Sequence, residues 1–112
     1  MIYASIGLFA LAAVLGLTIL IKWLSKSDVS NTVKYLHGLA AATALVILVI
    51  YAVKTPGNFP KTSIILFVIA ALGGFYMFIR DMSTKYRSIG IAAIHALLAV
   101  SGFVALLLFA FK

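Results

Sequence analysis

Four apolar stretches, joined by short polar connections, constrain the fold of this chain more than any other feature. They cover residues 2–24, 32–53, 62–79 and 88–111, to within a residue or two. A helix needs about 20 predominantly apolar residues to cross the hydrocarbon core of a bilayer. Only 10% of the residues are charged, whereas soluble domains contain about a quarter. The sequence therefore predicts an all-α fold, a four-helix transmembrane bundle, with residues 1–112 as a single transmembrane domain.

The connections contain the signals at which helices end and begin. Polar residues at 30–32 precede the second stretch, and Ser88 precedes the fourth, so each can cap the helix that follows. The only two prolines, Pro56 and Pro60, lie between the second and third stretches. Connections this short join antiparallel neighbours, so the expected order is up-down-up-down.

A tandem repeat is visible when the chain is compared with itself at an ungapped offset of 58 residues. Repeat 1 covers 1–54 and repeat 2 covers 59–112. The identical pairs include Ser5/Ser63, Phe9/Phe67, Gly16/Gly74 and His37/His95. Apolar composition alone does not readily align the glycines, phenylalanines and histidines together. The chain is therefore predicted to be a duplicated two-helix hairpin, with a pseudo-twofold axis along the membrane normal because each repeat contains two spans.

The distribution of cations predicts the orientation. One side has six cations and the other has three: Lys22, Lys26, Lys34, Arg80, Lys85 and Arg87 against Lys54, Lys61 and Lys112. Cytoplasmic loops carry the excess of lysine and arginine. We therefore expect an integral protein of a bacterial inner membrane, with both termini outside and loops 25–31 and 80–87 cytoplasmic. The net charge of +7 reflects these span ends and contact with lipid headgroups, so no nucleic-acid partner is expected.

The only two histidines are predicted to face each other. His37 and His95 lie at similar depths, about 7–11 Å from the starts of the second and fourth helices. Those helices are diagonal partners in an up-down bundle, which directs both rings toward the axis. Small residues at this level or on the histidine face are Gly16, Gly73, Gly74, Ala41, Ala44, Ala99 and Gly102. They leave room for a flat cofactor, although close helix packing also favours small residues.

The number of available protein ligands limits which cofactor the chain can bind. Zinc sites use three or four protein ligands, whereas this chain offers two histidines, no cysteine and no glutamate. Haem supplies four nitrogens itself and leaves two axial positions. The sequence thus predicts one non-covalent haem b per chain, with His37 and His95 as the iron ligands. Lys34, Arg80 and Arg87 are candidate partners for its propionates, and the same cations also serve as topology signals.

In architecture and in His37 and His95, the chain resembles the membrane b-type cytochromes, whose transmembrane helices hold haem between histidines. The resemblance implies a single haem near one face, since each of two helices has only one histidine. Electron transfer with a quinone or a redox protein is the first function considered, which makes the chain an electron carrier rather than a stand-alone enzyme.

Other functions stay open. A haem transport, storage or sensing subunit is one, and a cofactor-free membrane scaffold is another. A proton relay has less support, because no acidic residue lies within the predicted spans. Whether the chain forms a homodimer is left open by the sequence.

Overall fold

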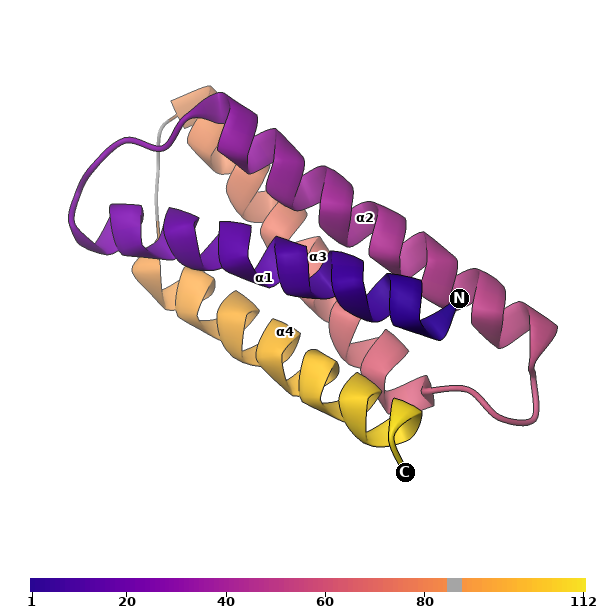
Figure 1. Ribbon diagram of the computed structural model, residues 1–112. Helices are drawn as coiled ribbons and strands as arrows, with labels where there is room; N and C mark the ends of the chain where they lie inside the picture. The colour runs from indigo at the N-terminus through magenta and orange to yellow at the C-terminus, as the bar shows by residue number, and fades with distance from the viewer. Residues whose placement is uncertain (85–87) are drawn as a thin grey trace.

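The computed structural model describes residues 1–84 and 88–112 and consists of four α-helices, with no strand in the part described (Figure 1). The helices are α1 (Ile2–Leu24), α2 (Asn31–Lys54), α3 (Lys61–Thr84) and α4 (Ile89–Ala110). At 22–24 residues, each is about 33–36 Å long, enough to cross a hydrocarbon core of about 30 Å. The predicted all-α four-helix bundle is confirmed.

Two predicted helix starts are also found. Ser30 Oγ accepts a hydrogen bond of 3.1 Å from the Thr32 amide, and Ser88 Oγ accepts one of 3.2 Å from the Ile91 amide. Each hydroxyl thus satisfies one amide of the first helical turn, which has no partner within the helix.

Helix α3 extends further than predicted, to Thr84 instead of about residue 79. The segment after Ile79 contains no glycine or proline that would stop a helix, and the Ser83 hydroxyl donates to the Ile79 carbonyl at 2.8 Å. Asp81 therefore lies in α3, where it is buried. The expectation that no acidic residue lies within the membrane-spanning helices was wrong.

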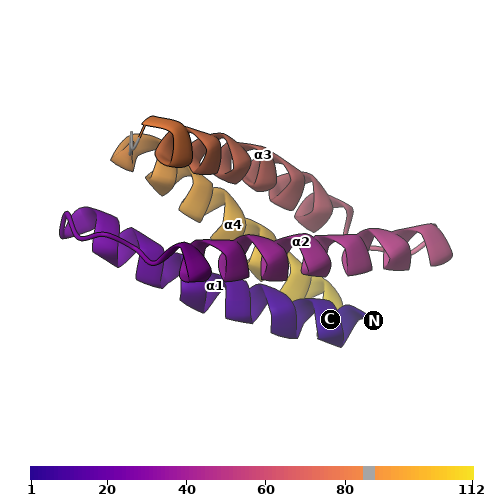
Figure 2. The same ribbon diagram turned by 90° about the horizontal axis from the view of Figure 1, so that it is seen from above.

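The helices form two hairpins. Helix α1 packs along α2 and α3 along α4, while α1 also contacts α4 and α2 contacts α3. Consecutive helices run in opposite directions (Figure 1), and from above α4 runs from beside α3, behind α2, to the end of α1 (Figure 2). Both termini lie at the same end, where the rings of Tyr3 and Phe111 are 5.8 Å apart.

The centre of the bundle is formed by residues that match at the offset of 58. Phe9 of α1 and Phe67 of α3 stack face to face, with ring centroids 3.8 Å apart and planes 6° from parallel. Leu48 and Leu106, a second matched pair, have no exposed surface and belong to the same core cluster. The core is therefore built from equivalent side chains of the two hairpins.

Each hairpin is also joined by a buried serine. Ser5 Oγ donates to the Ala44 carbonyl at 3.0 Å, and Ser63 Oγ donates to the Gly102 carbonyl at 2.8 Å. These bonds link α1 to α2 and α3 to α4 at equivalent positions. Such hydrogen bonds between helices are a common source of helix association in membranes.

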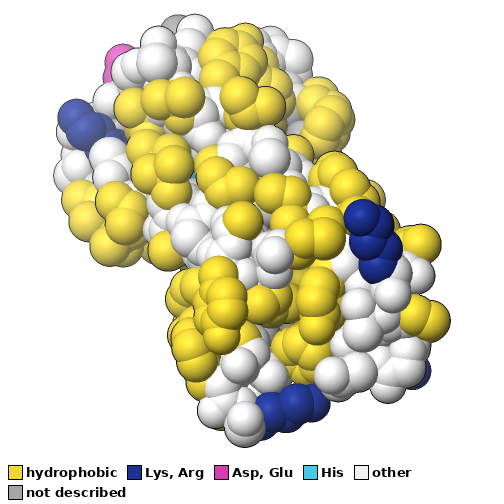
Figure 3. Space-filling model, turned by 45° about the vertical axis from the view of Figure 1, so that its right-hand side comes forward, with side chains coloured by type: hydrophobic (Ala, Val, Ile, Leu, Met, Phe, Trp, Pro, Cys, Tyr) yellow, Lys and Arg dark blue, Asp and Glu magenta, His cyan; other side chains and the backbone are white. Residues whose placement is uncertain are grey.

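The outer surface is apolar, as the predicted bilayer environment requires. Val53 is 75% exposed, and Leu72, Leu97 and Leu108 are each 69% exposed. Hydrophobic side chains cover much of the face shown in Figure 3, with only a few Lys and Arg side chains on it. All four helices are long and apolar enough to cross a membrane. This pattern is that of an integral membrane protein, whose helices contact a lipid bilayer.

Candidate functional site

The two histidine rings lie close together across the bundle. His37 on α2 and His95 on α4 have ring centroids 6.3 Å apart and planes at 76° to each other. Their helices are the diagonal pair, since no direct backbone contact joins α2 to α4 in the described part of the chain. The sequence predicted this arrangement from the shared depth and the diagonal position of the two helices.

Each imidazole is held by the neighbouring helix of its own hairpin. His37 Nδ1 is 2.8 Å from the Ala12 carbonyl oxygen, and His95 Nδ1 is 2.7 Å from the Ala70 carbonyl oxygen. A carbonyl oxygen can only accept, so Nδ1 carries the proton in both rings. In the neutral form of each ring, the other nitrogen, Nε2, then has an available lone pair, which is the state in which a histidine binds a metal.

Gly16 and Gly74 make room for these rings. A Cβ atom at Gly16 would lie 2.8 Å from Cε1 of His37, and one at Gly74 would lie 2.9 Å from Cε1 of His95. Both contacts are too short for any side chain to be tolerated without moving the ring. The space that glycine opens at this level is thus filled by an imidazole, so the two glycines seat the histidines rather than a flat cofactor directly.

The other small residues have different surroundings. A Cβ at Gly73 would meet nothing within 4 Å, so this glycine does not contact the histidine pair. Ala44 and Gly102 accept the serine hydrogen bonds, and a Cβ at Gly102 would meet the Phe67 ring at 3.2 Å. These two lie in the contact between helices. The remaining two positions, Ala41 and Ala99, are half-buried.

Two of the three candidate propionate ligands already contact other groups of the protein. Lys34, half-buried at the start of α2, forms an ion pair with the buried carboxylate of Asp81 on α3. Arg80 Nη1 donates to the Tyr76 hydroxyl at 3.3 Å. Arg87 lies outside the described residues. Lys34 and Arg80 are therefore at least partly engaged with protein groups.

The position related to this ion pair by the offset of 58 is apolar. Lys34 corresponds to Ala92, and Asp81 corresponds to Trp23. Trp23 and Ala92 are buried together with Val29 in one hydrophobic cluster. The hairpins thus meet through a charged contact on the α2–α3 side and through an apolar contact on the α1–α4 side.

The described side chains do not form a site for a metal ion without a cofactor. Among the described residues, no group of three or more histidine, cysteine, aspartate or glutamate side chains comes together. Two imidazoles with ring centroids 6.3 Å apart can offer two nitrogen ligands and no more. A metal held here needs its remaining ligands from another source.

These features define the class of the protein: an all-α bundle of four membrane-length helices with a histidine pair across its axis. Comparison with protein-family models, with curated proteins and with solved structures gives no match for this chain. The functional argument therefore rests on the geometry of the site.

Two features of the site were not predicted from the sequence. The Lys34–Asp81 pair was missed because Asp81 was placed in a connection, and the absence of helix-stopping residues after Ile79 was the signal that could have found it. The stacking of Phe9 on Phe67 was missed although both were recognised as a matched pair. The sequence did not show that both residues lie close to the pseudo-twofold axis. Equivalent residues of the two repeats that lie on this axis contact each other.

Proposed function

We propose that the protein binds one haem b between His37 and His95 and transfers electrons to or from a quinone or a redox protein. The observation that carries this proposal is the matched tethering of the two rings through Nδ1, at 2.8 and 2.7 Å, with their centroids 6.3 Å apart. Each tether leaves Nε2 as the nitrogen that can bind iron.

The separation of the rings supports one shared metal. The two ring centroids lie 6.3 Å apart, close enough for both imidazoles to reach one metal ion. Haem completes the ligand count, because its four nitrogens supply what the protein lacks.

The residues of the chain have defined roles in this proposal. The carbonyls of Ala12 and Ala70 fix the tautomer and the direction of each ring. Gly16 and Gly74 let the rings lie against α1 and α3. When bound between His37 and His95, haem would supply a one-electron carrier, and the two imidazoles would leave the iron no position for oxygen chemistry. Electron transfer therefore fits better than oxygenation.

The orientation is part of the proposal. The histidine pair lies toward the end with connection 25–30, and the excess of cations at this end favours a cytoplasmic location in a bacterial cell. An electron partner then approaches from that side. A single haem near one face does not by itself connect the two sides of the membrane.

A cofactor-free scaffold is the second candidate, because the hydrogen bonds from His37 and His95 already join α1 to α2 and α3 to α4. Absorption spectroscopy separates the two. Protein purified from haem-replete cells should show a sharp Soret band and split low-spin bands on reduction, whereas a colourless preparation contradicts the haem proposal. Rapid reduction by quinol supports electron transfer, and rapid exchange of haem with an apo-acceptor supports haem handling instead.

A further inference from the structure

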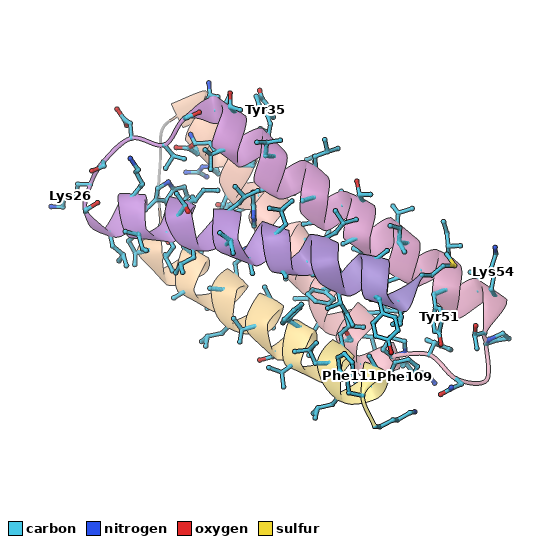
Figure 4. All side chains as sticks on the ribbon, viewed as in Figure 1. Lys26, Tyr35, Tyr51, Lys54, Phe109 and Phe111 are labelled. Carbon is cyan, nitrogen blue, oxygen red and sulfur yellow. The ribbon has the colours of Figure 1, made fainter. Side chains whose placement is uncertain are left out.

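A second feature lies at the end of the bundle opposite the histidines. The turn at residues 56–59 lines a hollow that is open to the surface, together with Lys61, Phe109 and Lys112. Its volume is about 240 Å³, well above the roughly 10–15 Å³ that a cavity needs to hold one water molecule. Figure 4 shows Phe109 at this end, beside Tyr51, with Lys26 and Tyr35 at the other end. The hollow is therefore separate from the histidine pair.

Both lysines of the hollow are held by aromatic rings. Lys112 Nζ lies 4.5 Å from the centroid of the Phe109 ring and donates to Asn58 Oδ1 at 3.3 Å. Lys61 Nζ lies 5.7 Å from the centroid of the Phe59 ring. A ring face attracts an ammonium group and reduces the freedom of its long side chain. The two charges are thus partly ordered before any ligand arrives.

No acidic side chain is present at this end to balance these charges. The only acidic residues of the chain, Asp28 and Asp81, both lie toward the opposite end, and Asp81 is paired with Lys34. Lys54, Lys61 and Lys112 all lie at the end with the hollow. The side chains at this end therefore carry an excess of positive charge, which attracts an anionic group.

We propose that this hollow binds a phosphate group, with Lys61 and Lys112 as its charged ligands. An ammonium group is a strong point-charge partner for phosphate, and each lysine has three donors, of which Lys112 gives one to Asn58. The group can belong to an anionic phospholipid or to a soluble phosphate. When the helices cross a bilayer, lipid phosphates lie at the helix ends, which is the depth of this hollow. The proposal does not depend on haem.

Native mass spectrometry of the detergent-solubilised protein tests the site. Phosphatidylglycerol should be retained about tenfold more strongly than zwitterionic phosphatidylcholine, because two ammonium groups meet one net negative charge. The double variant Lys61→Gln/Lys112→Gln should lose this preference. The matched control Lys26→Gln/Lys54→Gln removes the same net charge from exposed positions outside the hollow and should keep it (Figure 4).

The outcomes distinguish the sources of the phosphate. Retention of phosphatidylglycerol that millimolar inorganic phosphate does not displace supports a lipid site, and direct binding of inorganic phosphate supports a soluble ligand. Equal loss in both double variants overturns the proposal, since net charge alone then explains binding, and so does the absence of binding by either probe. The milder Asn58→Ala variant, which removes only the anchor of Lys112, should weaken binding by less than the double variant and covers the case in which the latter fails to fold.

Discussion

The two contacts between the hairpins at the histidine end differ although they occupy equivalent positions. On the α2–α3 side, Lys34 pairs with buried Asp81; on the α1–α4 side, Trp23 packs near Ala92. The histidine tethers, by contrast, are the same in both halves to within 0.1 Å. At these positions the contacts within the two hairpins are thus alike, whereas this one pair of contacts between the hairpins differs. As a result, His37 is three residues from a lysine, and His95 is three residues from an alanine.

Removing one charge from the ion pair should have the largest effect. Asp81→Ala leaves the ammonium of Lys34 half-buried without its carboxylate, which we expect to cost about 3 kcal/mol of unfolding free energy. Copying the apolar contact with Lys34→Ala/Asp81→Trp should restore most of this loss, because no charge then stays buried. Unfolding in SDS followed by circular dichroism measures both. If the double variant is less stable than the single one, the two contacts are not interchangeable and the comparison fails.

The second-largest loss of stability should come from displacing an imidazole, and this loss should be equal in the two halves. Gly16→Ala and Gly74→Ala place a Cβ 2.8 and 2.9 Å from the histidine rings, so each should cost about 1–3 kcal/mol and lengthen the Nδ1 hydrogen bond. The Nδ1 proton resonances in nuclear magnetic resonance spectra report that bond. Gly73→Ala is the matched control, since its Cβ meets nothing within 4 Å. A control that shifts the resonances as strongly would contradict this role for Gly74.

The buried serines should show the smallest effect, again the same in both hairpins. Ser5→Ala and Ser63→Ala each remove one hydrogen bond to the facing helix, for which we expect a loss of about 1 kcal/mol. Ser101→Ala, at an exposed position on α4, should change stability by much less. Unequal losses of stability in Ser5→Ala and Ser63→Ala would show that the contacts within the two hairpins also differ.

The sequence was sufficient for the parts of the structure that depend on local pattern. Apolar length predicted the four helices, the polar residues at 30–32 and Ser88 marked two helix starts, and the shared depth on diagonal helices predicted that His37 and His95 lie opposite each other. These features follow from helix geometry and from symmetry.

The packing partners of individual residues could not be predicted in the same way. Gly16 was expected to leave space for a cofactor, but the imidazole of its own hairpin fills that space. Lys34 was expected to face a propionate, but it meets Asp81 after α3 continues beyond its predicted end. In both cases a side chain from a neighbouring helix decides the outcome, and the sequence pattern of one helix does not contain that information.

The most direct test of the proposed function compares the reduced absorption spectra of His37→Ala and His95→Ala with that of the unaltered protein. If the two rings share one iron, the unaltered protein contains one haem b per chain with split low-spin bands, and each single variant loses those bands. A low-spin spectrum that persists in either variant would contradict a haem held between His37 and His95.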